Sequence, residues 1–109
     1  MFADNTNLIS ITLINFDDHH LTNLQLMFGG CYSLISVDFS NFNVENVEYM
    51  EILFLYCHSL KSIDFSNLYA KNLKNASHFF HESYSFISVN ISNFLGPNVE
   101  NIDHMFFNF

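Results

Sequence analysis

An internal repeat of 26 residues, which runs through the chain without a gap, constrains the fold more than any other feature. The four rows of the repeat cover residues 7–32, 33–58, 59–84 and 85–109. Several columns hold one residue type in every row, among them Phe28, Phe54, Phe80 and Phe106, and Asn15, Asn41, Asn67 and Asn93. A repeat of this length is typical of architectures whose neighbouring units bury a shared core. We therefore predict that residues 1–109 form a single repeat domain.

Each row has two halves with different hydrophobic periods. The first half reads L-x-x-[IV]-x-[LFI], and this alternation predicts a short strand with one buried face. In the second half the apolar residues fall about three apart, which predicts a helix or a mixed α and 3₁₀ segment. In the second row these residues are Val44, Val47, Met50, Leu53, Phe54 and Cys57. Asn43 is a candidate N-cap, and Gly96-Pro97 is expected at the bend into the helix of the fourth row.

Stacked strand-plus-helix units predict an α/β fold. The expected architecture is a right-handed solenoid of the leucine-rich-repeat type, with four 26-residue repeats and a parallel sheet on one face. The repeated phenylalanines are expected in its core, because each ring buries about 150–250 Å² at ~25 cal/mol per Å². Neither end carries a polar capping element, so we expect a fragment of a longer array or an end-to-end contact with further repeats.

Three segments resemble the BspA-like leucine-rich repeats. They are CYSLISVDFSNFNVENVEYM, CHSLKSIDFSNL and the aligned SFISVNISNF. In that family a cysteine precedes S-L-x-x-[LI]-D-[LF]-S-N-F, and N-V-x-N-M and M-F follow. The resemblance covers Asn7 to Phe109, with departures at Thr12, where the family favours Asp, and at Ser83 and Phe109, which replace the cysteine.

Known members of this family form arrays on the surfaces of host-associated bacteria, mycoplasmas and parasitic protists. The resemblance therefore implies adhesion to, or interaction with, host or extracellular proteins. It also favours a location at the cell surface or outside the cell, although the first residues show no signal peptide.

The charge of the chain narrows the class of partner. Only 3 residues are Lys or Arg, against 11 Asp or Glu, and the net charge is −8. Nucleic acids and anionic lipid headgroups need a basic patch, so neither is an expected partner. No apolar run reaches the roughly 18 residues of a membrane helix, so we expect no membrane insertion in this segment.

The polar residues that alternate with buried strand positions should point outward and form a candidate binding face. They are Ser10, Thr12, Ser36, Asp38, Ser62, Asp64, Ser88 and Asn90. Beside them run Ile9, Ile35 and Ile87, interrupted by Lys61, which form either an exposed apolar stripe or a column tucked against the loop edge. We predict that this face binds a protein or a glycan, and the alternative is that its polar residues are merely solvated.

The cysteines and histidines suggest a second class of site. Cys31 and Cys57 share a column, so they are either within reach of a disulfide or a pair of buried, reduced thiols, and we favour the second interpretation. His78, His81 and His104 could take up a divalent ion. No thiolate or carboxylate completes their set, so we favour exposed histidines, with no metal and no cofactor. His19-His20 stands apart from them.

Other polar groups match templates poorly. Asp17-Asp18, Glu45, Glu48 and Glu51 fit neither a calcium loop nor a pair of catalytic carboxylates, and we expect them on a solvated side. Asn75-Ala76-Ser77 and Asn90-Ile91-Ser92 are N-glycosylation acceptor sequences, which matter only in a secreted eukaryotic protein.

The sequence contains no phosphate-binding loop, dinucleotide-binding turn or G-x-S-x-G motif, and we do not expect an enzyme. The leading hypothesis is a non-enzymatic protein-interaction or adhesion module, exposed at a surface, that binds through its outward strand face. One alternative is a structural spacer within a larger repeat array. Another is a metal or redox site that uses the histidines or the cysteines.

Overall fold

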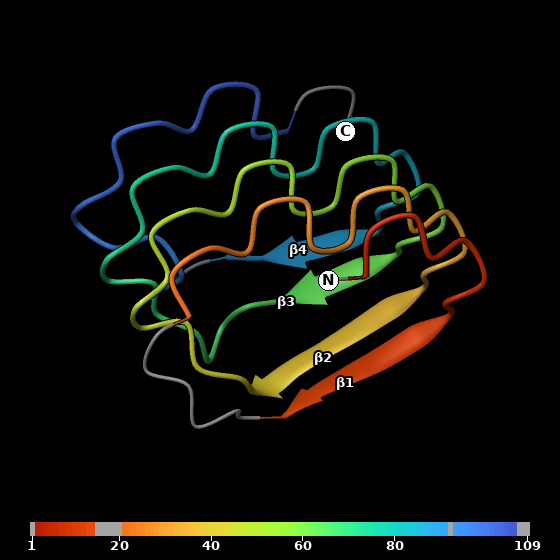
Figure 1. Ribbon diagram of the computed structural model, residues 1–109, viewed down its shortest axis with the longest axis horizontal. Helices are drawn as coiled ribbons and strands as arrows, with labels where there is room; N and C mark the ends of the chain where they lie inside the picture. The colour runs from red at the N-terminus through yellow and green to blue at the C-terminus, as the bar shows by residue number, and fades with distance from the viewer. Residues whose placement is uncertain (1, 15–20, 92, 107–109) are drawn as a thin grey trace.

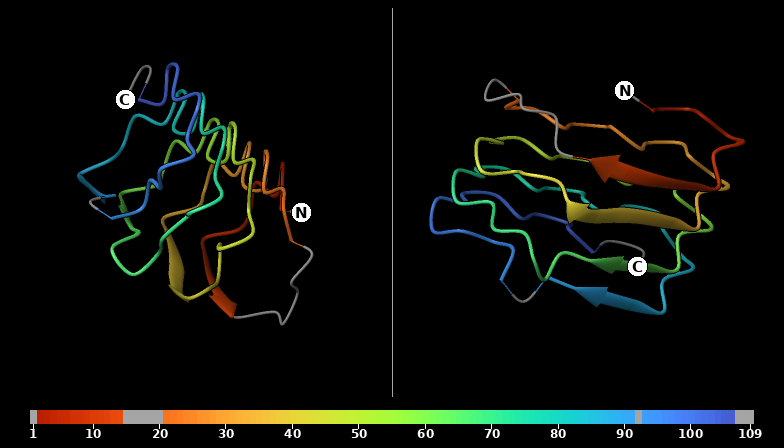
Figure 2. Two further views of the ribbon diagram at one scale, coloured as in Figure 1. Left: turned by 90° about the vertical axis from the view of Figure 1, so that its left-hand side faces the viewer. Right: turned by 90° about the horizontal axis from the view of Figure 1, so that it is seen from below.

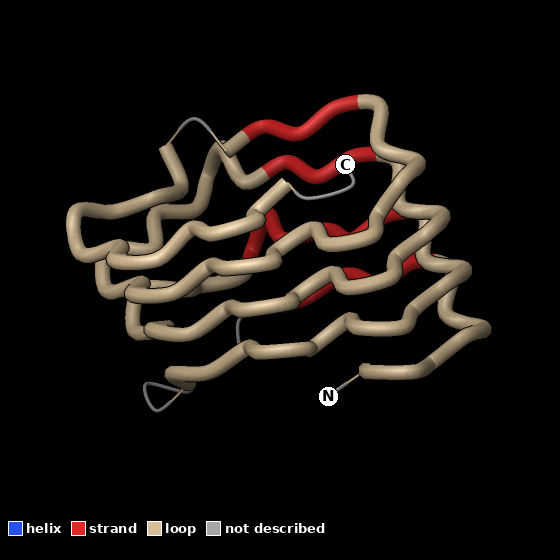
Figure 3. The backbone as a smooth tube through the Cα atoms, turned by 90° about the horizontal axis from the view of Figure 1, so that it is seen from above, coloured by secondary structure: helices blue, strands red, loops and turns tan. Residues whose placement is uncertain are grey.

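The computed structural model describes residues 2–14, 21–91 and 93–106, which contain four strands and no helix. The strands are β1 (Ser10–Ile14), β2 (Ser36–Asn41), β3 (Ser62–Asp64) and β4 (Ser88–Asn90). β1 pairs with β2, and β3 pairs with β4, so that two small parallel sheets result. Figure 1 shows the strands in sequence order along one side, with the connecting segments stacked opposite them. Figure 3 shows strands and loops alone.

The strands form where apolar and polar residues alternate. In β2 the side chains of Val37 and Phe39 are buried and those of Ser36 and Asp38 are exposed. Backbone hydrogen bonds join successive rows just before the strands. The Ile35 N–H donates to the Ile9 carbonyl at 2.7 Å, and the Lys61 N–H donates to the Ile35 carbonyl at 3.2 Å. The two sheets therefore lie side by side, as Figure 2 also shows.

The segments opposite the strands, residues 21–32, 47–58, 73–84 and 99–106, are here called return segments. They are chains of tight turns in which two columns have positive φ, between 51° and 74°. The columns are Leu26, Ile52, His78 and His104, and Gly30, Tyr56 and Glu82; Asp4, which precedes the first row, has the same conformation as the second column. The Cys31 N–H, for example, donates to the Phe28 carbonyl at 3.1 Å, which places left-handed Gly30 third in a four-residue turn. A type II turn has positive φ at that position.

Alternate peptide groups of the return segments point along the stack. The N–H of Leu26 donates to the carbonyl of Glu51 at 3.1 Å, in the next row. The N–H of Ile52 donates to the carbonyl of Ser77 at 3.1 Å, and the N–H of His78 donates to the carbonyl of Asp103 at 2.9 Å. All three bonds have the same sense, from an earlier row to a later one. Alternate backbone donors are thus used between rows, whereas others, such as the Cys31 N–H, close turns within one segment.

The predicted helices are therefore wrong. An α-helix needs consecutive right-handed residues and N–H bonds to the carbonyl four residues earlier. The observed turns instead bring a side chain back into the core every three or four residues, which reproduces the spacing of Val47, Met50 and Leu53 without a helix. Asn43 caps no helix either, since none follows it in the described residues; its Oδ1 accepts the Glu45 N–H at 2.8 Å in a local turn.

The predicted fold class is also wrong, because it depended on the helices. An α/β leucine-rich-repeat solenoid, built from strand-plus-helix repeats with one parallel sheet, is contradicted by helix-free residues 2–14, 21–91 and 93–106 and by two separate two-stranded sheets. The surface-array description attached to that fold loses its structural support. The 26-residue period itself is retained in the structure, since residues 26 apart pair, as Ser10 does with Ser36 and Ser62 with Ser88.

The core is organised around a stack of phenylalanine rings. Successive ring centroids in the stack lie 5.5–5.7 Å apart, with interplanar angles of 5–19°. The stack contains Phe2, Phe28, Phe54, Phe80 and Phe106. Phe28, Phe54 and Phe80 are fully buried, which confirms the core prediction for them, and Phe106 is 43% exposed. Phe2, which precedes the first predicted row, is an addition that the sequence reading missed.

Candidate interaction surface

The predicted polar residues share the exposed side of the strands, and the predicted isoleucines lie one residue before β1, β2 and β4. The backbone register pairs Ser10 with Ser36 and Thr12 with Asp38 across β1 and β2. Across β3 and β4 it pairs Ser62 with Ser88 and Asp64 with Asn90. All predicted residues are exposed: Ile9, Ser10, Thr12, Ile35, Ser36, Asp38, Ser62, Asp64, Ile87, Ser88 and Asn90. We call this set, together with exposed Lys61 from the third row of the isoleucine column, the strand face.

The isoleucines of the strand face form an exposed apolar stripe. Ile9, Ile35 and Ile87 are 58%, 41% and 80% exposed, so they do not tuck against the loop edge. Lys61 takes the third row of this column and is exposed as well. Exposed apolar groups gathered beside polar ones are a common feature of interaction sites.

The two carboxylates of the strand face are held by local turns. Asp38 Oδ1 accepts the Ser40 N–H at 2.9 Å, and Asp64 Oδ1 accepts the Ser66 N–H at 2.9 Å. Hydrogen bonds from the side chain and then the backbone of Ser40 lower the pKa of Asp38, and Ser66 lowers the pKa of Asp64 in the same way. Both carboxylates are therefore charged and fixed in direction at neutral pH.

These turns predict a pH dependence of stability. Because the folded pKa of each carboxyl lies below the unfolded one, their contribution is complete above the unfolded value and is lost as pH falls through the folded value. An Asp38→Asn/Asp64→Asn variant should therefore lose less stability than wild type as the pH falls below about 4. Urea denaturation across this range measures the difference. Equal pH slopes in the two proteins would contradict the prediction.

A column of three rings, with half-buried His58 between exposed Tyr32 and Tyr84, precedes the strands. The ring centroid of His58 lies 5.1 Å from that of Tyr32 and 5.3 Å from that of Tyr84. Tyr32 and Tyr84 are 43% and 57% exposed. The sequence analysis missed this column, although the 26-residue spacing of the three residues would have revealed it. Because the rings lie against one another, they are more suited to joining the rows than to stacking on a ligand.

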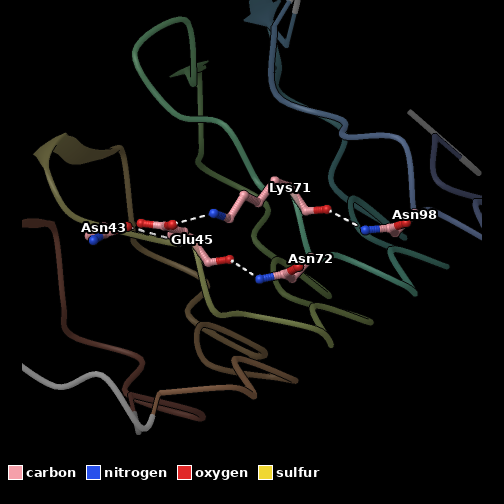
Figure 4. Close-up of polar contacts among 5 residues, drawn as sticks. All are labelled: Asn43, Glu45, Lys71, Asn72 and Asn98. Carbon is pink, nitrogen blue, oxygen red and sulfur yellow. Dashed lines mark hydrogen bonds and ion pairs between the residues drawn. The ribbon is translucent and has the colours of Figure 1, made fainter.

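Away from the strand face, a polar network ties the second, third and fourth rows together (Figure 4). Lys71 forms an ion pair with Glu45, and Asn72 Nδ2 donates to the Glu45 carbonyl at 2.9 Å. Asn98 Nδ2 repeats this bond one row later, to the Lys71 carbonyl at 2.9 Å.

A second ion pair joins Lys74 to Glu48, also away from the strand face. Lys74 Nζ lies 3.1 Å from Glu48 Oε2, and this hydrogen bond raises the pKa of Lys74. The chain has 3 basic residues, all lysines. With Lys71 and Lys74 in ion pairs, Lys61 is the lysine that the strand face presents.

The cysteine column is a buried row of hydrogen-bond donors. Cys31 Sγ donates to the Phe2 carbonyl and Cys57 Sγ to the Phe28 carbonyl, both at 3.1 Å. Ser83, in the same column, donates to the Phe54 carbonyl at 2.7 Å. Both thiols are free, and burial raises the pKa of Cys31 and of Cys57. A raised pKa disfavours the thiolate, which is the reactive form of cysteine.

Ser83 shows how the column accepts a change of residue. Cys57→Ser keeps a donor for the Phe28 carbonyl and should change the free energy of unfolding by less than about 1 kcal/mol. Cys57→Ala removes the thiol donor from the Phe28 carbonyl, which keeps the Cys31 N–H, and also removes buried volume, so it should cost about 1–2 kcal/mol. Urea denaturation under reducing conditions compares the two. A serine variant as unstable as the alanine variant would contradict the hydrogen-bond role.

The histidines cluster without forming a metal site. The ring centroid of His78 lies 5.1 Å from that of His81 and 5.0 Å from that of His104. Within the described residues, no three His, Cys, Asp or Glu side chains are placed to hold a metal ion. His19-His20 and Asp17-Asp18 lie outside the described residues.

Other predicted polar sites are engaged in local contacts. Glu51 Oε1 accepts a hydrogen bond from Asn75 Nδ2 at 3.0 Å. Asn75 Oδ1 in turn accepts the Ser77 N–H at 2.9 Å, so the first glycosylation acceptor is part of a turn. The second acceptor sequence includes Ser92, outside the described residues.

An open hollow of about 420 Å³ lies beyond the end of β3. It is lined by Ser66, Asn67, Leu68, Tyr69, Asn93 and Leu95. These residues include no carboxylate, histidine, lysine or cysteine, and the hydroxyl groups among them are those of Ser66 and Tyr69. In the part of the chain that the structure describes, no helix is long and apolar enough to cross a bilayer.

One comparison with known proteins gives a result. A family model described as "Mycoplasma protein of unknown function, DUF285" matches residues 1–109. No curated protein and no solved structure matches the chain. The family description names no ligand, activity or site.

Proposed function

The chain belongs to the DUF285 family, and we propose that it is a non-enzymatic protein-interaction or adhesion module that binds through its strand face. One observation carries this proposal: the strand face gathers polar and apolar side chains, all exposed, on and just before strands whose opposite side is buried or half-buried. Binding residues on a packed scaffold lose little conformational entropy when a partner arrives. The side chains available are suited to recognition rather than to chemistry.

The architecture supports such a role. Every row adds one residue to each column of the face, so the face grows by a fixed step along the stack. The resemblance of the sequence to BspA-like repeats supports a partner outside the cell, a host or extracellular protein or a glycan. The buried, high-pKa thiols make a redox role a poorer explanation of the same structure.

Bulky, uncharged substitutions on the face test the proposal. A partner found on protein and glycan arrays should bind Ser36→Tyr and Ser62→Tyr at least about tenfold more weakly, because the new rings block the face. Gln25→Tyr is the matched control, since Gln25 is also exposed but belongs to a return segment. Equal binding by all three variants would contradict the proposal and favour a structural spacer.

A further inference from the structure

Two parallel stripes cross the strand face, with one residue from each row. The apolar stripe contains Ile9, Ile35, Lys61 and Ile87, and the acidic stripe contains Thr12, Asp38, Asp64 and Asn90. Paired parallel strands lie about 4.8 Å apart, so four rows span roughly 14 Å. The stripes run across the strands, and a ligand that follows them must match the spacing of the rows.

This spacing selects the conformation of a peptide ligand. A helix presents the same side every 5.4 Å, which differs from the row spacing by only about 0.6 Å per turn. An extended peptide presents the same side every ~6.7 Å and loses register by about 2 Å at each row. Side chains at positions i, i+3, i+4 and i+7 of a helix can therefore meet successive rows.

The charges of the face select the composition of the helix. Asp38 and Asp64 follow each other in the acidic stripe, each directed by a hydrogen bond from the following serine. Lys71 and Lys74 are held in ion pairs elsewhere, so they do not offset these carboxylates. Lys61 interrupts the apolar stripe at the third row, where its positive charge would repel a cation of the partner.

From this geometry we infer that the strand face receives an amphipathic helix of a protein partner. Its apolar side lies on the isoleucine stripe, and its Lys or Arg residues lie against Asp38 and Asp64. Opposite Lys61 it carries an acidic or neutral polar residue. This inference rests on the proposed function and names the partner class for the same face.

A designed peptide is the probe. It has about 14 residues, or four helical turns, with leucines on one side, lysines beside them and a side-chain cross-link that holds the helix. Fluorescence anisotropy at low salt measures its binding. A scrambled peptide of the same composition without the cross-link tests the need for a helix, and a glutamate version tests the sign of charge.

The expected results are specific to the face. Asp38→Asn/Asp64→Asn keeps the amide oxygens that accept the serine N–H groups and should weaken binding about three- to tenfold. Asp4→Asn/Asp103→Asn removes the same charge from exposed residues outside the face and should leave binding unchanged. Lys61→Glu should strengthen binding of the all-lysine helix.

Three outcomes would overturn the inference: equal binding of the scrambled peptide, equal loss in the two double variants, or no binding of the designed helix. None of them would remove the proposed function if an array partner remained sensitive to Ser36→Tyr and Ser62→Tyr. Loss of that sensitivity, with the helix still bound, would instead remove the proposed function alone.

Discussion

Replacing Phe54 by alanine should lower the free energy of unfolding by about 3–5 kcal/mol. The ring is fully buried and stacks on Phe28 at 5.5 Å and on Phe80 at 5.7 Å. It also meets Phe39 edge-on, with ring centroids 6.3 Å apart, and Phe65 in a more parallel contact, with ring centroids 6.5 Å apart. No single neighbour can therefore fill the cavity that the ring would leave. Urea denaturation followed by circular dichroism measures the loss.

Phe106→Ala is the matched control for this substitution. Phe106 belongs to the same stack but is 43% exposed, and its ring stacks on Phe80 at 5.5 Å. Its removal therefore exposes less apolar surface, and the expected loss is less than half of that at Phe54. Equal losses would mean that the stack does not concentrate its stabilisation in the interior rows.

The second large effect is expected at Gly96. A Cβ at this position would lie 2.7 Å from the Ala70 carbonyl oxygen and 2.7 Å from Lys71 Cα, both backbone atoms of the preceding row. Since backbone cannot rotate away, Gly96→Ala should push the third and fourth rows apart and cost about 1–3 kcal/mol. The bridge between Ala70 and Leu95 lies beside it, so amide hydrogen exchange should rise at Ala70.

Gly29→Ala tests the explanation. There the new Cβ would meet the side chain of Leu26, an exposed residue that can move. We expect a smaller loss of stability than at Gly96, and no local rise in amide exchange between the third and fourth rows. A larger loss at Gly29 would show that close approach of backbone is not what fixes glycine at position 96.

The repeat made much of the architecture predictable. The period of 26, the strand positions and the buried Phe28, Phe54 and Phe80 all follow from residues that recur in phase. The helices did not follow, because a three-residue spacing of apolar side chains also arises from successive turns. Such turns are usually recognised by Gly or Asn at left-handed positions.

In this chain that signal is hidden. The left-handed columns hold residues such as Leu26, Ile52 and Tyr56, and Gly30 is the glycine among them. A β-branched residue such as Ile52 is uncommon in this conformation. Bonds to the neighbouring rows hold the backbone there, an effect of tertiary contacts that no local sequence pattern reports.

The strand face was predictable for a different reason. Alternation fixes which strand residues point outward, and exposure of Ser36, Asp38, Ser62 and Asp64 agrees with it. The hydrogen bonds within the face were less accessible, because the turns at Asp38 and Asp64 depend on where each strand ends. Asn72 and Asn98, which join the rows, were not among the predicted residues.

Most hydrogen bonds between return segments share one direction, apart from those that the Thr22, Glu48 and Lys74 carbonyls accept, and this excess gives the molecule an electrical polarity. In ordinary sheets the peptide dipoles largely cancel, whereas here alternate peptide groups point the same way along the stack. Each carries about 3.5 D, and aligned groups add as they do in a helix. The positive, N–H end of this macrodipole faces the fourth row, where Glu100 and Asp103 supply the negative charge that such an end favours.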